Sequence, residues 1–124
     1  MPRYLHTCYR IGDIDSSVSF YEKLGFQEAR RMPIGDEATN VFMQLPGQDP
    51  VLELTYNHGV DAYDLGTAYG HIAVAVPDAY AACEKIRASG GAVTREAGPV
   101  MGGSTVIAFV TDPDGYKVEL IQRS

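Results

Sequence analysis

Two histidines and two glutamates occur along the chain as matching pairs. The interval from His6 to Glu53 is nearly the same as the interval from His71 to Glu119. Two imidazoles and two carboxylates suit a borderline divalent ion such as Zn²⁺, Ni²⁺ or Co²⁺, with positions left for water or substrate. The four residues are therefore candidate ligands of one shared metal site.

Each of these residues also has a simpler interpretation when it is taken alone. A single histidine in a strand is more often a hydrogen-bonded structural residue than a metal ligand. A glutamate between apolar neighbours can point outward, because successive strand residues alternate between the two faces of a sheet. If the leucines on either side of Glu53 face a hydrophobic layer, Glu53 faces the opposite side, and Val118 and Leu120 impose the same direction on Glu119. Because the spacing repeats, the interpretation as a metal site stands beside the simpler structural one.

The elements around the candidate ligands repeat once, with an offset of about half the chain. Strand-like runs at 4–11 and 69–76 hold the two histidines. A short acidic turn and a helical pattern follow each run. The expected helix caps are Asp15 or Ser16 and then Asp78 at the N-termini, and Gly25 and Gly90 at the C-termini.

Three more strand-like stretches follow each expected helix. They cover 27–33, 39–45 and 51–56 in the first half, and 92–96, 104–110 and 116–122 in the second. Turn signals rich in glycine, proline and aspartate separate several of them. Each half therefore reads as β-α-β-β-β. We expect an α+β fold of two paired βαβββ modules, forming a single domain over 1–124 with halves at about 1–58 and 66–124.

Composition narrows the function classes. The chain has 124 residues, which argues for one domain, and its formal net charge of −6 disfavours nucleic acid or an anionic membrane as partner. No apolar run approaches the ~20 residues of a membrane-spanning helix, and the N-terminal residues lack a signal-peptide pattern. Two cysteines fit free thiols in a reducing compartment. A soluble cytoplasmic protein is the expectation.

Further chemistry-bearing residues have ordinary structural interpretations. His58 has no partner at the repeat offset and is expected in a loop. Cys8 shares the face of His6, but its repeat counterpart is Ala73, which favours packing within the sheet. The glycine-rich stretch 98–103 lacks the lysine and the following helix of a phosphate-binding loop, and reads as a flap between strands. No Gly-x-Ser-x-Gly motif supports nucleophilic acyl transfer.

The chain carries Glu-Leu-Thr-Tyr-Asn at 53–57, Gly-Thr-Ala-Tyr-Gly-His at 66–71 and Asp-Pro-Asp-Gly at 112–115. With these motifs the sequence resembles, over nearly its whole length, the bacterial glyoxalase I family of the vicinal-oxygen-chelate superfamily. The Asp-Pro-Asp-Gly turn is common in the superfamily, whereas Glu-Leu-Thr-Tyr-Asn and Gly-Thr-Ala-Tyr-Gly-His are much more specific to this family. The matching segments are 6–13, 52–57, 59–73, 94–99, 105–109 and 112–120.

The resemblance implies a lactoylglutathione lyase, a carbon–sulfur lyase. Such an enzyme isomerises the hemithioacetal of methylglyoxal and glutathione to S-D-lactoylglutathione through an ene-diolate intermediate. It further implies a homodimer with metal sites at the subunit interface, each built from two ligands of either subunit. Carried over by position, the metal ligands are His6, Glu53, His71 and Glu119. Glu119 is the expected catalytic base, and Glu53 could serve the substrate of opposite stereochemistry. Ni²⁺ is the expected metal, ahead of Co²⁺ and then Zn²⁺.

Glutathione is the implied co-substrate, and its two carboxylates and its amides require polar contacts. Arg10 and Asn57 match family substrate contacts, and Arg95 is a further candidate. Met101 stands where relatives usually carry a lysine, and His58 stands where many carry a tryptophan. These departures leave open another thiol adduct, such as trypanothione or bacillithiol. A related epimerase or oxygenase, and a non-enzymatic sequestering protein of the same fold, also stay open.

Overall fold

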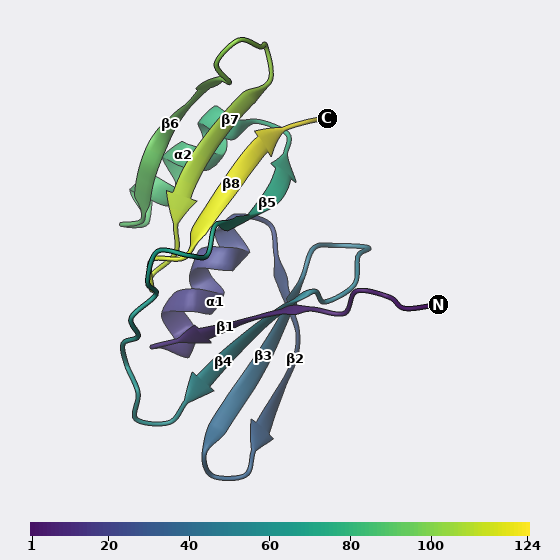
Figure 1. The fold of residues 1–124 in the computed structure, drawn as a ribbon, viewed down its shortest axis with the longest axis vertical. Helices are drawn as coiled ribbons and strands as arrows, with labels where there is room; N and C mark the ends of the chain where they lie inside the picture. The colour runs from purple at the N-terminus through teal and green to yellow at the C-terminus, as the bar shows by residue number, and fades with distance from the viewer. The chain divides into compact units, whose positions relative to one another are not determined.

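The computed structural model describes residues 1–124, which divide into two compact units at 1–64 and 65–124 (Figure 1). Both units have the order β-α-β-β-β, which confirms the α+β fold expected from the repeat. Unit 1 consists of β1 (Thr7–Ile11), α1 (Ile14–Lys23), β2 (Gln27–Ile34), β3 (Ala38–Gln44) and β4 (Leu52–Asn57). Unit 2 consists of β5 (His71–Val76), α2 (Ala79–Ala88), β6 (Ala92–Pro99), β7 (Val106–Thr111) and β8 (Lys117–Gln122). That the two units make a single domain stays a prediction.

Each unit forms one four-stranded sheet, and the two sheets have the same topology. The strand order is β1-β4-β3-β2 in unit 1 and β5-β8-β7-β6 in unit 2 (Figure 1). The first and last strands of each unit pair in parallel, and the other neighbours are antiparallel. The strand that carries each histidine segment therefore lies directly beside the strand that carries the matching glutamate.

A single helix packs against each sheet, so each sheet has one buried face. Helix α1 contacts β2, β3 and β4, and helix α2 contacts β6, β7 and β8. Burial of apolar side chains against the helix drives this arrangement, at roughly 25 cal/mol per Å² of apolar surface removed from water. The strand residues buried on the helix side are Tyr9, Ile11, Val41, Met43, Leu52 and Leu54 in unit 1, and Val74, Val76, Ala108, Val110, Val118 and Leu120 in unit 2. Ala38 and Phe42 of β3 are buried as well.

The strand alternation expected for the two glutamates is confirmed. Leu52 and Leu54 are 2% and 0% exposed, and the residues on either side of Glu119 are both fully buried. Because neighbouring strand residues point to opposite faces, Glu53 and Glu119 project from the sheet face that the helix does not cover. Each glutamate therefore lies on the open face of the sheet of its own unit.

The helix ends agree with the sequence at three positions and disagree at one. Gly25 and Gly90 follow the C-caps of α1 and α2 with φ of +100° and +85°, a conformation that glycine adopts without steric cost. Asp78 caps α2 by accepting a hydrogen bond from the backbone N–H of Ala81. The expectation that Asp15 or Ser16 caps α1 is wrong, because α1 begins at Ile14.

The N-cap of α1 is Asp13. Its carboxylate accepts hydrogen bonds from the backbone N–H and the hydroxyl of Ser16, at 2.8 and 2.7 Å. These two bonds, the backbone one first, lower the pKa of Asp13. A side chain at the N-cap satisfies a backbone N–H three residues ahead, so Ser16 is the group that is capped rather than the cap.

Strand edges shift by a few residues from their expected places. β1 begins at Thr7, so His6 lies one residue before the strand. β6 continues to Pro99, and the segment expected to be a flap is a short connection closed by hydrogen bonds between Val100 and Thr105 and between Gly103 and Val100. Neither helix has the length and apolar character needed to span a lipid bilayer.

Candidate metal centre

In unit 1, His6 and Glu53 form a pair of potential metal ligands. In the parallel pairing of β1 with β4, Cys8 lies opposite Glu53. His6 is two residues before Cys8 and therefore projects from the same face as the glutamate. Its Nε2 lies 3.6 Å from Glu53 Oε1, and the side chains are 38% and 14% exposed.

Unit 2 repeats this arrangement with His71 and Glu119. In the pairing of β5 with β8, Ala73 lies opposite Glu119, and His71 is again two residues earlier. The His71 Nε2 lies 3.1 Å from Glu119 Oε1, and the side chains are 37% and 18% exposed. The identical register explains why the sequence spacing repeats.

The donor atoms of both pairs fit a divalent ion. Two ligand atoms that bind one ion at about 2.1 Å and roughly a right angle lie about 3 Å apart. The separations of 3.6 and 3.1 Å are close to that value. Within either unit no third His, Cys, Asp or Glu side chain joins the pair. Each unit therefore offers two of the four donors that a mixed nitrogen and oxygen site would use.

A phenylalanine stands beside each pair, which the sequence reasoning missed. Phe42 in β3 lies opposite Glu53, and Phe109 in β7 lies opposite Glu119. Both rings meet their histidine edge-on, Phe42 with His6 at 5.8 Å between centroids and Phe109 with His71 at 5.0 Å. These contacts restrict the imidazole orientation. The interval between Phe42 and Phe109 differs from the interval between the two histidines, so the sequence repeat does not single them out. Only their cross-strand pairing with the glutamates would have revealed them.

Glu53 is held by a chain of hydrogen bonds. Asn40 donates from Nδ2 to Glu53 Oε2 at 3.3 Å, and the Thr55 hydroxyl donates to Asn40 Oδ1 at 2.8 Å. Because Thr55 has one hydroxyl proton, the contact of 3.3 Å with Cys8 Sγ makes the thiol the donor. Burial raises the pKa of the Cys8 thiol, so at neutral pH it keeps the proton that it donates.

Glu119 has no such support. Its only side-chain hydrogen bond is the one to His71. The positions that correspond to Asn40 and Thr55 hold Ile107 and Ile121, which pair with each other across β7 and β8. The carboxylate of Glu119 therefore has apolar neighbours where that of Glu53 has an amide.

The predicted substrate contacts Arg10 and Asn57 both lie in unit 1. Arg10 is exposed on β1, on the face of His6, and lies opposite Thr55. Asn57 ends β4 and donates from Nδ2 to the hydroxyl of Tyr63 at 2.9 Å. Their roles as substrate contacts stay predictions.

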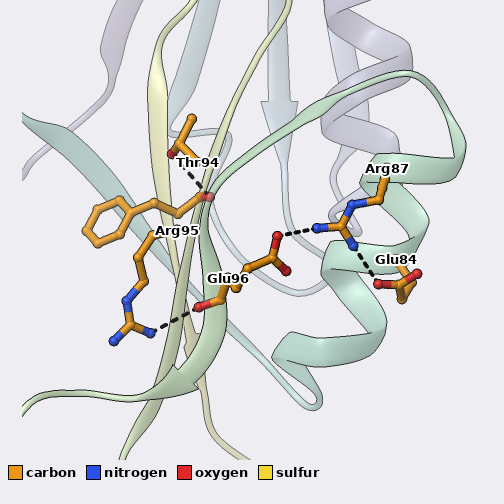
Figure 2. Close-up of polar contacts among 6 residues, drawn as sticks. Glu84, Arg87, Thr94, Arg95 and Glu96 are labelled. Atoms are coloured by element: carbon orange, nitrogen blue, oxygen red, sulfur yellow. Dashed lines mark hydrogen bonds and ion pairs between the residues drawn. The ribbon is translucent and has the colours of Figure 1, made fainter.

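The third predicted contact, Arg95, is engaged by its own main chain. Its Nη1 donates to the carbonyls of Glu96, Gly98 and Ile107, and its Nη2 donates to that of Pro99, at 2.9–3.1 Å. Figure 2 shows Arg95 turned toward the Glu96 carbonyl, while the Glu96 carboxylate pairs instead with Arg87, which also contacts Glu84. These bonds assign Arg95 a structural task in addition to any contact with substrate.

His58 closes the turn between β2 and β3, in keeping with its expected loop position. Its Nδ1 lies 2.9 Å from the Asp36 carbonyl, and its Nε2 lies 2.9 Å from the Thr39 hydroxyl. In the neutral ring Nδ1 must therefore donate, since a carbonyl only accepts, and Nε2 accepts from Thr39.

Comparisons with known proteins show which family this chain resembles. A model of the Glyoxalase/Bleomycin resistance protein/Dioxygenase superfamily matches residues 3–120. The lactoylglutathione lyase of Escherichia coli is 56% identical over 98% of this chain and 93% of that protein. Glyoxalase I from Zea mays is 48% identical with a TM-score of 0.91, over 98% of this chain and 45% of that longer one. The trypanothione-dependent glyoxalase I of Leishmania major is 40% identical with a TM-score of 0.85, over 98% of this chain and 87% of that one.

Proposed function

The chain belongs to the Glyoxalase/Bleomycin resistance protein/Dioxygenase superfamily, and from this premise we propose that it acts as a metal-dependent lactoylglutathione lyase. Its reaction is the isomerisation of the methylglyoxal–glutathione hemithioacetal to S-D-lactoylglutathione, which removes methylglyoxal. The observation that carries the proposal is the pair of matching His–Glu donor sets, at 3.6 and 3.1 Å, on the open faces of two like sheets. The 56% identity to a lactoylglutathione lyase across nearly the whole chain supports the same activity.

The proposal includes a homodimer that completes each metal site at the subunit interface. At its candidate site each unit offers only one histidine and one glutamate, so a four-ligand site requires two such pairs. Each centre would take one pair from either subunit: His6 and Glu53 form one, and His71 and Glu119 form the other. Dimerisation is then a condition of activity.

The metal ion in this proposal is Ni²⁺, ahead of Co²⁺ and Zn²⁺. When bound, a divalent ion acts as a Lewis acid that stabilises negative charge on the two adjacent oxygens of the substrate. The histidines supply neutral nitrogen donors when unprotonated, and the phenylalanine beside each ring restricts its orientation.

Glu119 is the proposed proton-transfer group. Its carboxylate takes the proton from the substrate carbon that carries sulfur and returns a proton to the neighbouring carbonyl carbon. This task requires a carboxylate that can move, and Glu119 has no side-chain hydrogen bond besides that to His71. Glu53 is tied to Asn40 and would act as the steadier ligand, and it would serve as base for the opposite stereoisomer only by releasing that hydrogen bond.

The polar open face of unit 1 would hold the thiol co-substrate. Arg10 and Asn57 are the proposed contacts, Arg10 for a carboxylate and Asn57 for the peptide amides. Glutathione is the proposed thiol because the lactoylglutathione lyase of Escherichia coli is more similar to this chain than the trypanothione-dependent enzyme of Leishmania major is. A cytoplasmic location, without nucleic-acid or membrane partners, completes the proposal.

The test is activity of metal-stripped protein after separate reloading with Ni²⁺, Co²⁺ and Zn²⁺. With methylglyoxal and glutathione, thioester formation should return with Ni²⁺ and only weakly with Zn²⁺. Parallel assays with trypanothione and bacillithiol identify the thiol. Stoichiometric metal binding without turnover of any adduct would contradict the proposed reaction and redirect the search to an epimerase.

A further inference from the structure

Arg30 and Arg95 occupy the same position in the two units. They are separated by the same offset as the two histidines, and each follows a register shift, between Glu28 and Arg30 in β2 and between Val93 and Arg95 in β6. Arg30 lies opposite Phe42, and Arg95 lies opposite Phe109. In each unit the glutamate, the phenylalanine and the arginine therefore lie side by side on three neighbouring strands, in that order.

The guanidinium of Arg95 is occupied because β6 has a second irregularity. The register shifts again between Arg95 and Gly98, so this segment leaves the regular ladder with β7. Its carbonyls turn toward the arginine, as Figure 2 shows for Glu96. The carbonyls of Gly98, Pro99 and Ile107 also accept its hydrogen bonds.

Arg30 meets a different backbone. From Arg31 to Ile34 strand β2 pairs regularly with β3, so the carbonyls that face β3 stay in the ladder. The guanidinium carbon lies 4.4 Å from the centre of the Phe42 ring, and no ion pair or hydrogen bond joins the Arg30 guanidinium to another residue. A cation over an aromatic ring is held by attraction to the π face, which leaves its N–H donors available.

Those donors lie in a pocket shared with a candidate ligand. The pocket has a volume of about 260 Å³ and is lined by His6, Phe42 and Arg30, with Arg3 and Asp49 among its other residues. Two arginines and one aspartate make it locally positive in a chain whose net charge is −6. Phe42 contacts both His6 and Arg30, so it joins the cation to the metal half-site.

We propose that Arg30 binds a carboxylate of the thiol co-substrate in the pocket beside His6. The inference rests on the proposed function and adds a specificity residue on the side of β2 to the contacts expected from Arg10 and Asn57. A planar guanidinium with available donors suits a carboxylate, which it can hold through two parallel hydrogen bonds.

The experiment compares Arg30→Gln and Arg30→Lys with the matched control Arg31→Gln. Arg31 is the next residue on β2 and pairs with Glu28 at 2.8 Å, so its loss removes the same charge from the neighbouring position. KM and kcat are measured with methylglyoxal and glutathione, and Kd is measured calorimetrically with S-methylglutathione. Two further probes identify which carboxylate is bound. They are the glycyl monoester of S-methylglutathione and the analogue of S-methylglutathione that lacks the γ-glutamyl carboxylate.

In Arg30→Gln we expect KM and Kd to rise about tenfold or more while kcat changes little, since a charge-assisted bond is lost from binding. Arg30→Lys should recover part of the affinity, and Arg31→Gln should stay within about twofold of the unmodified protein. The unmodified protein should bind one of the two altered probes more weakly than it binds S-methylglutathione. Arg30→Gln should bind that same probe with an affinity no lower than its affinity for S-methylglutathione.

The outcomes separate this inference from the proposed function. An unmodified protein that neither turns over the hemithioacetal nor binds S-methylglutathione would overturn both. An active protein whose Arg30→Gln variant keeps its KM and Kd would overturn the carboxylate contact alone. Equal losses in Arg30→Gln and Arg31→Gln would also overturn it, because they would indicate a general charge effect.

Discussion

The two units share a skeleton and a donor pair, yet their open sheet faces differ in chemistry. Around Glu53 the same face carries Cys8, Asn40 and Thr55, whereas around Glu119 the corresponding positions hold alanine and isoleucines. Glu53 is consequently linked to a polar chain, and the carboxylate of Glu119 bonds only to its histidine.

The difference shows that topology and register place a ligand, while its neighbours decide how freely it moves. A parallel strand pair with the same register brings histidine and glutamate together in both units. The hydrogen-bonded carboxylate is suited to steady coordination, and the one with apolar neighbours is suited to proton transfer. The arginines next to each phenylalanine divide in the opposite sense, since Arg95 of unit 2 is tied to carbonyls and Arg30 of unit 1 is available.

The largest effect should come from replacing the less supported glutamate. We expect Glu119→Gln to retain some metal binding but to lower kcat by about 10³-fold or more, because an amide cannot accept the substrate proton. Metal content by elemental analysis and turnover of the hemithioacetal test this. Near-normal activity in metal-loaded Glu119→Gln would show that the two glutamates do not divide their roles in this way.

Removing a histidine should act on metal binding in both units alike. His6→Ala and His71→Ala should each weaken Ni²⁺ binding by at least about 100-fold, since loss of a direct ligand exceeds the 10–100-fold effect of outer partners. Calorimetric titration of the metal-free proteins measures it. The control is His58→Ala, which should leave metal affinity unchanged because the His58 ring bonds to Asp36 and Thr39 and to neither His–Glu pair.

The arginine pair should differ in stability. Arg95→Gln should lower the free energy of unfolding by about 2 kcal/mol, because four carbonyls lose a charged donor. Arg30→Gln should cost less than about 1 kcal/mol, the range of an exposed cation–π contact. Urea denaturation followed by circular dichroism distinguishes them, and equal losses would contradict the difference between the two arginines.

Making unit 1 resemble unit 2 should weaken the centre moderately. Asn40→Leu removes the hydrogen bond to Glu53 and should lower Ni²⁺ affinity about tenfold. Ile107→Val, at the corresponding position of unit 2, serves as control and should have no effect on affinity. The same calorimetric titration applies, and unchanged affinity in Asn40→Leu would mean that Glu53 needs no support.

The smallest effect concerns pH and the N-cap of α1. Because hydrogen bonds from Ser16 lower the pKa of Asp13 in the folded chain, its stabilising effect is present above the ordinary carboxyl pKa. That effect is lost as pH falls through the lower folded value. Unfolding of Asp13→Asn and the unmodified protein should therefore converge in acid; a gap that widens as pH falls would contradict the cap.

Much of the fold followed from the sequence, because its signals are local. The alternation of strand residues predicted that Glu53 and Glu119 project from the sheet face away from their buried leucine and valine neighbours. Glycine was expected where each helix ends in a left-handed residue. The cap of α1 was missed because several acidic and hydroxyl residues stand in a row, and only the first helical residue decides which one caps.

The sequence by itself determined the repeat and the βαβββ order, and it singled out His6, Glu53, His71 and Glu119, since periodicity and repeated spacing are visible along the chain. Only the tertiary structure decided that phenylalanines stand beside the histidines, that Asn40 supports Glu53, and that Arg95 binds carbonyls while Arg30 faces a pocket. These contacts cross between strands and depend on register and bulges. A periodic pattern within one strand does not contain that information.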